Sequence, residues 1–350
     1  MNKRIPALAL SLTLLLSGCV SLSDSSYTVV EPHTEQPVLG EDPSTVKAST
    51  YSELVNGVLF FVTQGMEEGV IQLTDYHGDV EEDLNRACLE VDQDDPLGAY
   101  AVEFIKNDYT TILTTYEATI TISYRRSLEQ ISSLVNITGT SAIREEAAQA
   151  LGAFDTELAL RVGVFNGDVD TVKEQVRQAY YDTPAAALGM PECSVTLYPD
   201  TGVQRIVEIL LDYPQEPTVL KRKSEQLQEQ AAVILAPIQY QIESRRLDLL
   251  LETLPGVVKA DPQGGSTAWD ALLGEGADDE GLALAFQLLC SDMGLDSEIV
   301  EGTLEGSPHF FNSVTRNGTT VWVDLSRSLS QTWTAKQMVE LGYQWEGQEA

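Results

Sequence analysis

An Asn-Gly pair at residues 317–318 lies between two stretches of alternating apolar and polar residues, and it constrains the fold more than any other feature of the sequence. Asn-Gly is the strongest short-range signal for a two-residue β-hairpin, because both residues tolerate the positive φ angles of a type I′ turn. If these residues form the turn, Phe311 lies opposite Asp324, and His309 lies diagonally beside Asp324 on the same face of the sheet. The hairpin alone therefore predicts a contact between His309 and Asp324.

A strongly apolar segment precedes this hairpin. Residues 281–292 read Gly-Leu-Ala-Leu-Ala-Phe-Gln-Leu-Leu-Cys-Ser-Asp, which predicts a buried helix. Asp278 and Asp279 stand at its start, where carboxylates satisfy unpaired backbone N–H groups. A strand is expected at residues 297–304, between this helix and the hairpin. Residues 253–350 are therefore expected to form an α+β domain.

The same region resembles the transglutaminase-like superfamily, whose papain-like enzymes use Cys, His and Asp. The shared pattern has a cysteine at a helix start, two residues before Gly-aromatic-Ala-x-Ala-Phe, then His-Ala-Trp-Asn on one strand and Asp near the end of the next. This chain offers, in the same order, Gly-Leu-Ala-Leu-Ala-Phe at 281–286, His-Phe-Phe-Asn at 309–312 and Trp-Val-Asp at 322–324. The resemblance implies a papain-like fold, with His309 and Asp324 as the remnant of a catalytic dyad.

The chain departs from this pattern at the nucleophile. The position two residues before Gly281 is Asp279, which is already charged at neutral pH and attacks amides poorly. Asp279 is expected either to pair with His309 or to cap the helix. Cys290 lies eleven residues further along the same helix, about 16 Å along its axis, and is expected in the core. Cys88 and Cys193 fall outside this domain. Their spacing predicts neither a disulfide framework nor a zinc site.

Three hypotheses for function follow, of which we favour the first. The domain has lost catalysis, and it binds a peptide, a protein or a cell-wall fragment or acts as a scaffold. Alternatively, Asp279, His309 and Asp324 serve a divergent hydrolase or a metal-assisted enzyme, although one histidine and two carboxylates are too few to choose a metal. In the third hypothesis, the chain is a structural envelope protein whose function lies in its other modules. No cofactor is expected.

An internal duplication is predicted upstream of this domain. His-Gly-Asp-Val at 77–80 recurs as Asn-Gly-Asp-Val at 166–169, and the same offset separates Tyr124 from Tyr213. Each copy reads as a small α+β module with a helix, a strand, a second helix and a β-hairpin. The expected units are modules at 51–139 and 140–215, with hairpin strands at 99–105, 111–124, 194–198 and 203–213. Residues 216–252 are expected to form a linker helix or the first helix of the last domain, which Pro237 should break or kink.

The N-terminus carries an export signal. Lys3 and Arg4 precede an apolar run at residues 7–16, which is too short for a stable transmembrane helix. The run ends in Leu-Ser-Gly-Cys at 16–19, which resembles the lipobox of bacterial lipoproteins. The resemblance implies a signal peptide at 1–18, lipid on Cys19 as a membrane anchor and a location at the extracytoplasmic face of the cell membrane. Residues 19–50, rich in Ser, Thr, Pro and acids, are expected to be a flexible linker.

The charge of the chain excludes one class of partner. The formal net charge is −33, and loss of residues 1–18 would remove Lys3 and Arg4 and no acids, which makes it −35. Nucleic-acid binding depends on neutralisation of phosphates by Lys and Arg, so no nucleic-acid partner is expected. The expected partners are the membrane, through lipid on Cys19, and a peptide, protein or cell-wall ligand.

Overall fold

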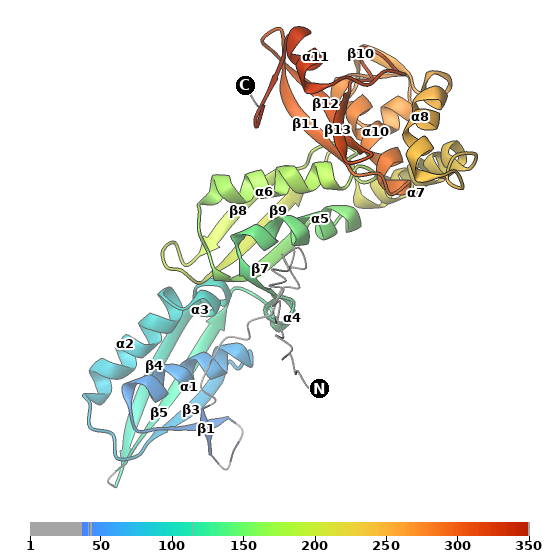
Figure 1. Ribbon diagram of the computed structural model, residues 1–350. Helices are drawn as coiled ribbons and strands as arrows, with labels where there is room; N and C mark the ends of the chain where they lie inside the picture. The colour runs from blue at the N-terminus through green and yellow to red at the C-terminus, as the bar shows by residue number, and fades with distance from the viewer. Residues whose placement is uncertain (1–36, 41, 43, 114, 349–350) are drawn as a thin grey trace, which may run out of the picture.

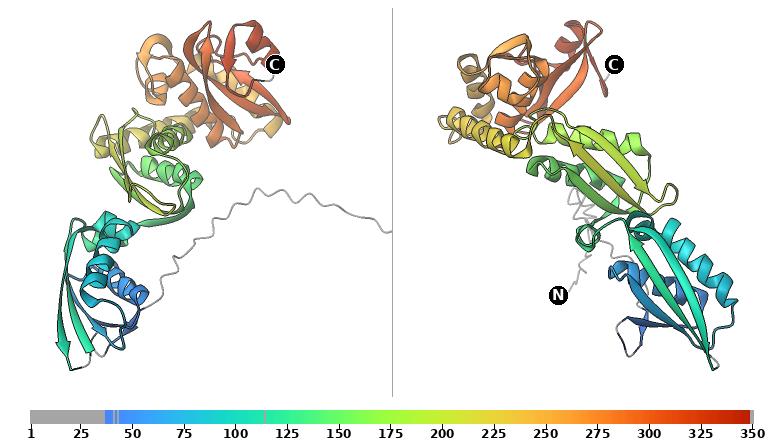
Figure 2. Two further views of the ribbon diagram at one scale, coloured as in Figure 1. Left: turned by 90° about the vertical axis from the view of Figure 1, so that its left-hand side faces the viewer. Right: turned by 180° about the vertical axis from the view of Figure 1, so that it is seen from behind.

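The computed structural model describes residues 37–348 apart from 41, 43 and 114. Its fold is α+β, and three parts follow one another along an elongated molecule (Figures 1 and 2). The predicted signal peptide at 1–18 and the predicted lipid site at Cys19 lie outside the described residues. Within the described part, no helix has both the length and the apolar character needed to cross a bilayer.

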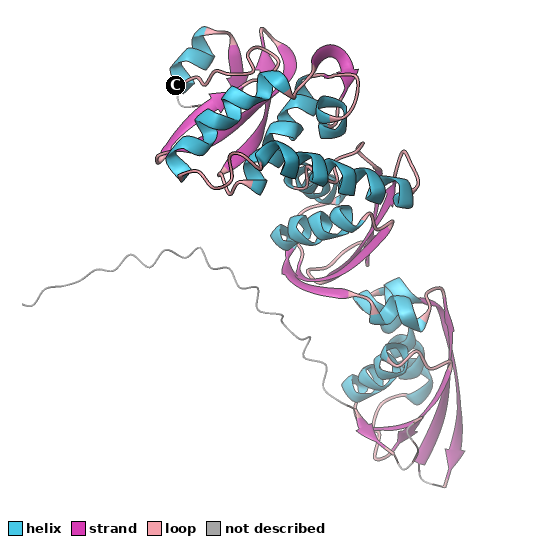
Figure 3. Ribbon diagram, turned by 90° about the vertical axis from the view of Figure 1, so that its right-hand side faces the viewer, coloured by secondary structure: helices cyan, strands magenta, loops and turns pink. Residues whose placement is uncertain are grey.

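The first part is a five-stranded sheet with helices on one face (Figure 3). The strand order is β1-β2-β3-β5-β4, in which β2 and β3 are parallel and the other pairs antiparallel. Its elements are β1 (Val38–Leu39), β2 (Thr45–Ala48), α1 (Tyr51–Thr63), β3 (Glu68–Leu73), α2 (Val80–Gln93), α3 (Pro96–Ala101), β4 (Val102–Ile112) and β5 (Thr115–Tyr124).

Two expectations for the first part were wrong. The flexible linker was expected to reach residue 50, but β2 pairs with β3, and Val46 and Ala48 are buried. A four-residue strand has too little periodicity to be recognised until its partner is known. The strand expected at 99–105 begins instead at Val102, because Asp95 caps a short helix with Pro96 in its first turn.

The second part repeats this arrangement with four strands. Its elements are β6 (Val135–Gly139), η1 (Thr140–Ala142), α5 (Ile143–Ala153), β7 (Glu157–Val164), α6 (Val169–Asp182), β8 (Glu192–Tyr198) and β9 (Arg205–Asp212). The order β6-β7-β9-β8, with β6 and β7 parallel, has the same pairing as β2-β3-β5-β4. The boundary expected after residue 139 was therefore misplaced, because β6 belongs to the second sheet. Origin of the two parts by duplication stays a prediction.

The first and second parts share a packed interface. Ala159 and Ile206 of the second part join the hydrophobic core of the first. Beside them, Arg126 contacts Glu208 at 2.5 Å, and Glu208 is only 5% exposed. The short helix α4 (Leu128–Ser132) connects the two sheets. A buried ion pair surrounded by apolar side chains tends to hold two units in one relative arrangement. We therefore expect these two parts to move together.

The linker region consists of two helices in place of one. α7 (Pro217–Leu235) ends just before Pro237, and α8 (Glu243–Thr253) follows after a turn. Apolar residues of α7 and α8 belong to one continuous core that joins the second part to the C-terminal domain. The C-terminal domain is therefore packed on the second part and is not separated from it by a free linker.

The C-terminal domain packs a central helix against a four-stranded antiparallel sheet of order β13-β12-β11-β14. Its elements are η2 (Leu254–Gly256), β10 (Ala260–Gly265), α9 (Ala268–Leu272), α10 (Asp279–Asp292), β11 (Ser297–Leu304), β12 (Ser307–Arg316), β13 (Thr319–Val323), α11 (Ala335–Glu340) and β14 (Tyr343–Trp345). Helix α10 is buried from Gly281 to Cys290 apart from the half-buried Gln287, as its apolar sequence predicts.

Candidate functional site

The candidate site forms where the first turn of α10 meets the end of the hairpin. Asp278 caps α10 by accepting a hydrogen bond from the backbone N–H of Gly281 at 3.0 Å. Asn312, buried in β12, donates from its side-chain amide to the backbone carbonyl of Ala283 at 3.1 Å. This bond fixes the first turn of α10 against β12. Asp279, the residue after the cap, is thereby placed beside His309, which lies on β12 together with Asn312.

The hairpin has the register that its Asn-Gly turn predicts. Arg316 pairs with Thr319, and Asn312 pairs with Val323. The register places His309 within reach of Asp324, and the His309 Nε2 atom lies 2.8 Å from the Asp324 Oδ2 atom.

Asp279 contacts the opposite side of the same imidazole ring. Its Oδ2 atom lies 2.9 Å from His309 Nδ1 and also accepts a hydrogen bond from the backbone N–H of Phe310 at 2.7 Å. The sequence left open whether Asp279 caps the helix or pairs with the histidine. The structure assigns the cap to Asp278 and the pairing to Asp279, so that His309 lies between two carboxylates.

Asp324 is held by further donors at the bottom of the site. It is 1% exposed, and its Oδ1 atom accepts hydrogen bonds from the backbone N–H and the hydroxyl of Ser326 at 2.9 and 2.6 Å. The hydroxyl of Tyr343 donates to its Oδ2 atom. A buried carboxylate is costly unless it is paired and hydrogen-bonded, and Asp324 has both kinds of partner.

The two carboxylates control the charge of the histidine. Burial opposes the charged form of His309, but hydrogen bonds to Asp279 and Asp324 outweigh it and raise the pKa to about 9. Burial acts to raise the pKa values of both aspartates, and hydrogen bonds, with His309 foremost, hold them below their ordinary range. At neutral pH the site is therefore an imidazolium between two carboxylates.

The imidazolium has a carboxylate on each side and no thiolate to act as a nucleophile. A histidine that activates a nucleophile must accept a proton, which a ring protonated at both nitrogens cannot do. Asp279 is 27% exposed and lies, with His309, on the wall of an open cavity of about 240 Å³ that Asp261 and Ser326 also line. The arrangement presents fixed charge to the cavity and offers no activated nucleophile there.

The geometry of these residues does not suit a metal ion either. A histidine ligand binds through the lone pair of a neutral imidazole, and both nitrogens of His309 face carboxylate oxygens. Across the described ranges, no group of three or more His, Cys, Asp and Glu side chains is arranged to hold a metal ion. The metal-assisted alternative thus has no support from the donor set.

The other cysteines lie away from this site. Cys290 is fully buried on α10, and burial raises the pKa of its thiol far above the ordinary range. Cys88 lies in the core of the first part, where burial raises its pKa to about 11. Cys193 lies on β8. Neither Cys88 nor Cys193 belongs to the elements that form the site.

Three side chains near the site were not assigned to it from the sequence. Ser326 follows Asp324 by two residues, a spacing typical of local Asp–Ser hydrogen bonding that could have indicated it. Tyr343 comes from a distant strand and carries no such signal. Tyr181, on α6 of the second part, contacts the ring of Phe310 with centroids 5.8 Å apart and donates to Glu280 at 3.1 Å. The second part therefore covers one side of the site.

This chain shows little similarity to known proteins. The chain matches no protein-family profile, and no curated protein sequence matches it significantly. Among solved structures it is similar to one described as "Crystal structure of a TGase", with 16% sequence identity and a TM-score of 0.27. The match covers 48% of this chain and 50% of that one, so the chain corresponds to about half the length of that protein. The role of the site is therefore inferred from its own residues.

Proposed function

We propose that residues 253–350 form a papain-like domain of the transglutaminase-like superfamily, in which Asp279 has replaced the nucleophilic cysteine. The observation that carries this proposal is the contact of Asp279 with His309 at the start of a buried helix, with Asp324 on the other side of the ring. A thiolate in the family's pattern stands at a helix start beside the histidine. A carboxylate there keeps the negative charge and the ion pair but lacks the reactivity.

The proposed role of this domain is to bind a peptide, protein or cell-wall ligand without transforming it. The imidazolium of His309 has no free acceptor nitrogen, and a carboxylate stands beside it in place of a thiolate, which supports a role without catalysis. The ion pair and its buried hydrogen bonds keep the cavity wall rigid, which suits recognition because little order must be created on binding.

Restoring the nucleophile tests this proposal. In an assay of amide hydrolysis and transamidation, the unaltered chain should be inactive, and Asp279→Cys should gain an activity that iodoacetamide abolishes. His309→Gln added to Asp279→Cys should lower that activity by about 10²-fold or more, because the thiol loses its base. Asp278→Cys is a matched control, since it places a thiol one residue earlier at the same helix end, and it should stay inactive. Activity in the unaltered chain, or none in Asp279→Cys, would contradict the proposal.

We further propose that the chain is a lipoprotein anchored through Cys19 at the extracytoplasmic face of the cell membrane. The support is the sequence at 1–19, where a short apolar run ends in Leu-Ser-Gly-Cys. Two or three acyl chains give stable attachment, whereas one gives marginal binding.

Cys19→Ser tests the anchor. The unaltered chain should incorporate labelled fatty acid and sediment with membranes, whereas Cys19→Ser should do neither. Cys88→Ser, which removes a different thiol, should behave like the unaltered chain. Equal fatty-acid labelling of the unaltered chain and Cys19→Ser would rule out lipid on this residue.

A further inference from the structure

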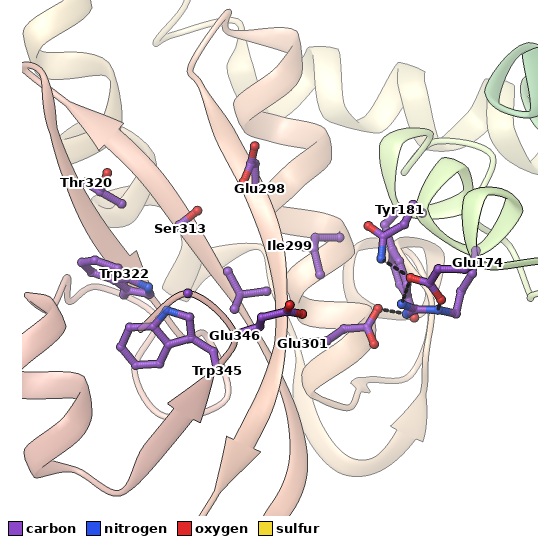
Figure 4. A pocket seen from close by; sticks show the side chains of 14 residues that line it. Glu174, Tyr181, Glu298, Ile299, Glu301, Ser313, Thr320, Trp322, Trp345 and Glu346 are labelled. Atoms are coloured by element: carbon purple, nitrogen blue, oxygen red, sulfur yellow. Dashed lines mark hydrogen bonds and ion pairs between the residues drawn. The ribbon is translucent and has the colours of Figure 1, made fainter. Parts of the chain in front are cut away.

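A second and larger groove lies between the C-terminal sheet and α6 of the second part (Figure 4). Its volume is about 760 Å³, within the range of about 300–1,000 Å³ that is typical of ligand pockets. It shares no lining residue with the cavity at Asp279. Binding in this groove therefore does not depend on the proposed loss of catalysis at Asp279.

The floor of the groove is a face of the sheet that ends in two indole rings. Glu298 pairs with Ser313, and Ser313 pairs with Trp322, so these three residues form a row across β11, β12 and β13. Trp345 of β14 lies against Trp322 with ring centroids 5.5 Å apart. Figure 4 shows the two indoles side by side at one end of the groove.

The indole N–H of Trp322 is buried and finds no hydrogen-bond partner among the residues that the structure describes. A buried donor of this kind normally bonds to an acceptor. The N–H itself has almost no exposed surface, and Trp322 lines the groove through other atoms of its side chain.

The opposite wall is one face of α6. Glu174, Arg177 and Tyr181 line the groove at helical spacing. Arg177 bonds to Glu174 on its own helix and to Glu301 across the groove. The single cation of the lining is thus already paired, and it also ties α6 to the sheet.

The charge of the lining is strongly acidic. Four glutamates face the groove, against Arg177 alone, and they are Glu174, Glu298, Glu301 and Glu346. Charges of one sign gathered in a concave site focus the field and attract ligands of the opposite sign. The net charge of −33 on the whole chain adds to this attraction at long range.

We propose that this groove binds an extended polypeptide segment that carries lysine or arginine. The carboxylates would pair with its cationic groups, and the faces of Trp322 and Trp345 would take a cation or its alkyl stem. A neutral sugar could stack on the indoles but would leave Glu298 and Glu346, which Arg177 does not pair, without opposite charge, so carbohydrate fits the groove less well.

The test uses the full-length chain in non-ionic detergent and the fluorescein-labelled peptide Ala-Arg-Ala-Lys-Ala-Arg-Ala, with binding followed by fluorescence polarisation. Binding should weaken with salt, because exposed charge pairs are screened. Trp322→Ala should weaken it about tenfold and Glu298→Gln about threefold. Arg177→Gln should strengthen it about threefold, because it releases two glutamates. Trp345→Leu provides a second probe of the indole pair if Trp322→Ala does not fold.

Glu229→Gln on α7, which removes one exposed acid that does not line the groove, controls for general charge and should leave binding unchanged. The proposal is overturned if Glu298→Gln has no larger effect than Glu229→Gln, or if the Arg177→Gln change weakens binding. It is also overturned if the peptide does not bind. A further contrary result would be that an N-acetylglucosamine oligomer binds, and that Trp322→Ala abolishes binding of this oligomer without changing binding of the peptide.

Discussion

Asp324→Asn is expected to lower the free energy of unfolding of the C-terminal domain by about 3–5 kcal/mol, the usual cost of removing one partner from a buried ion pair. The carboxylate of Asp324 accepts hydrogen bonds from Ser326 at one oxygen and contacts Tyr343 and His309 at the other. An asparagine has only one acceptor oxygen, and its NH₂ group would face donors. The imidazolium would also keep only Asp279 as a partner.

Tryptophan fluorescence during urea unfolding measures this effect selectively, because all four tryptophans lie within residues 253–350. Asp292→Asn is the matched control: the same chemical change on an exposed residue of the same domain should shift stability by no more than about 0.5 kcal/mol. If Asp324→Asn proved as mild as Asp292→Asn, Asp324 would not be an ionised partner of His309.

The second large effect is a loss of stability as pH rises above neutrality. The pKa of His309 is about 9 in the folded chain and about 6.5 when unfolded, so the folded state holds the proton more tightly. This contribution is fully present below about pH 6.5 and is lost as pH rises through about 9, in total on the order of 3 kcal/mol at about 1.4 kcal/mol per pKa unit.

The aspartates act in the opposite direction. Their pKa values are lowered in the folded chain, so their contribution is present above about pH 4 and is lost as pH falls further. The C-terminal domain should therefore be most stable between about pH 4 and 6.5. Urea unfolding at a series of pH values checks this, and His309→Gln should remove the decline between about pH 6.5 and 9. If the decline in stability persists in His309→Gln, titratable groups other than His309 cause it.

The parts of the site that depend on local sequence could be predicted. The Asn-Gly turn sets the register of β12 and β13, and through it the contact of His309 with Asp324. The apolar pattern likewise predicts α10, with acidic residues at its start. These features depend on neighbours in sequence, where turn chemistry and periodicity act directly.

The parts that depend on distant segments could not be predicted. Tyr343 reaches Asp324 from the last strand, and Tyr181 reaches Glu280 from the second part of the chain. The parallel partners β2 and β6 were missed for the same reason, since their pairing is set by strands that lie beyond an intervening helix. The choice between Asp278 and Asp279 as the cap also required the position of β12, because Asp279 bonds to the backbone of Phe310.

Asp279 and Asp324 hold His309 as an imidazolium, so the ring has no free nitrogen to act as a general base. A titration of the ¹⁵N-labelled imidazole by NMR measures this directly, with Asp279→Asn as the companion variant. We expect both ring nitrogens of His309 to stay protonated at neutral pH, with a midpoint near 9, and we expect Asp279→Asn to lower the midpoint. A midpoint at or below about 6.5, the ordinary value for histidine, would contradict it.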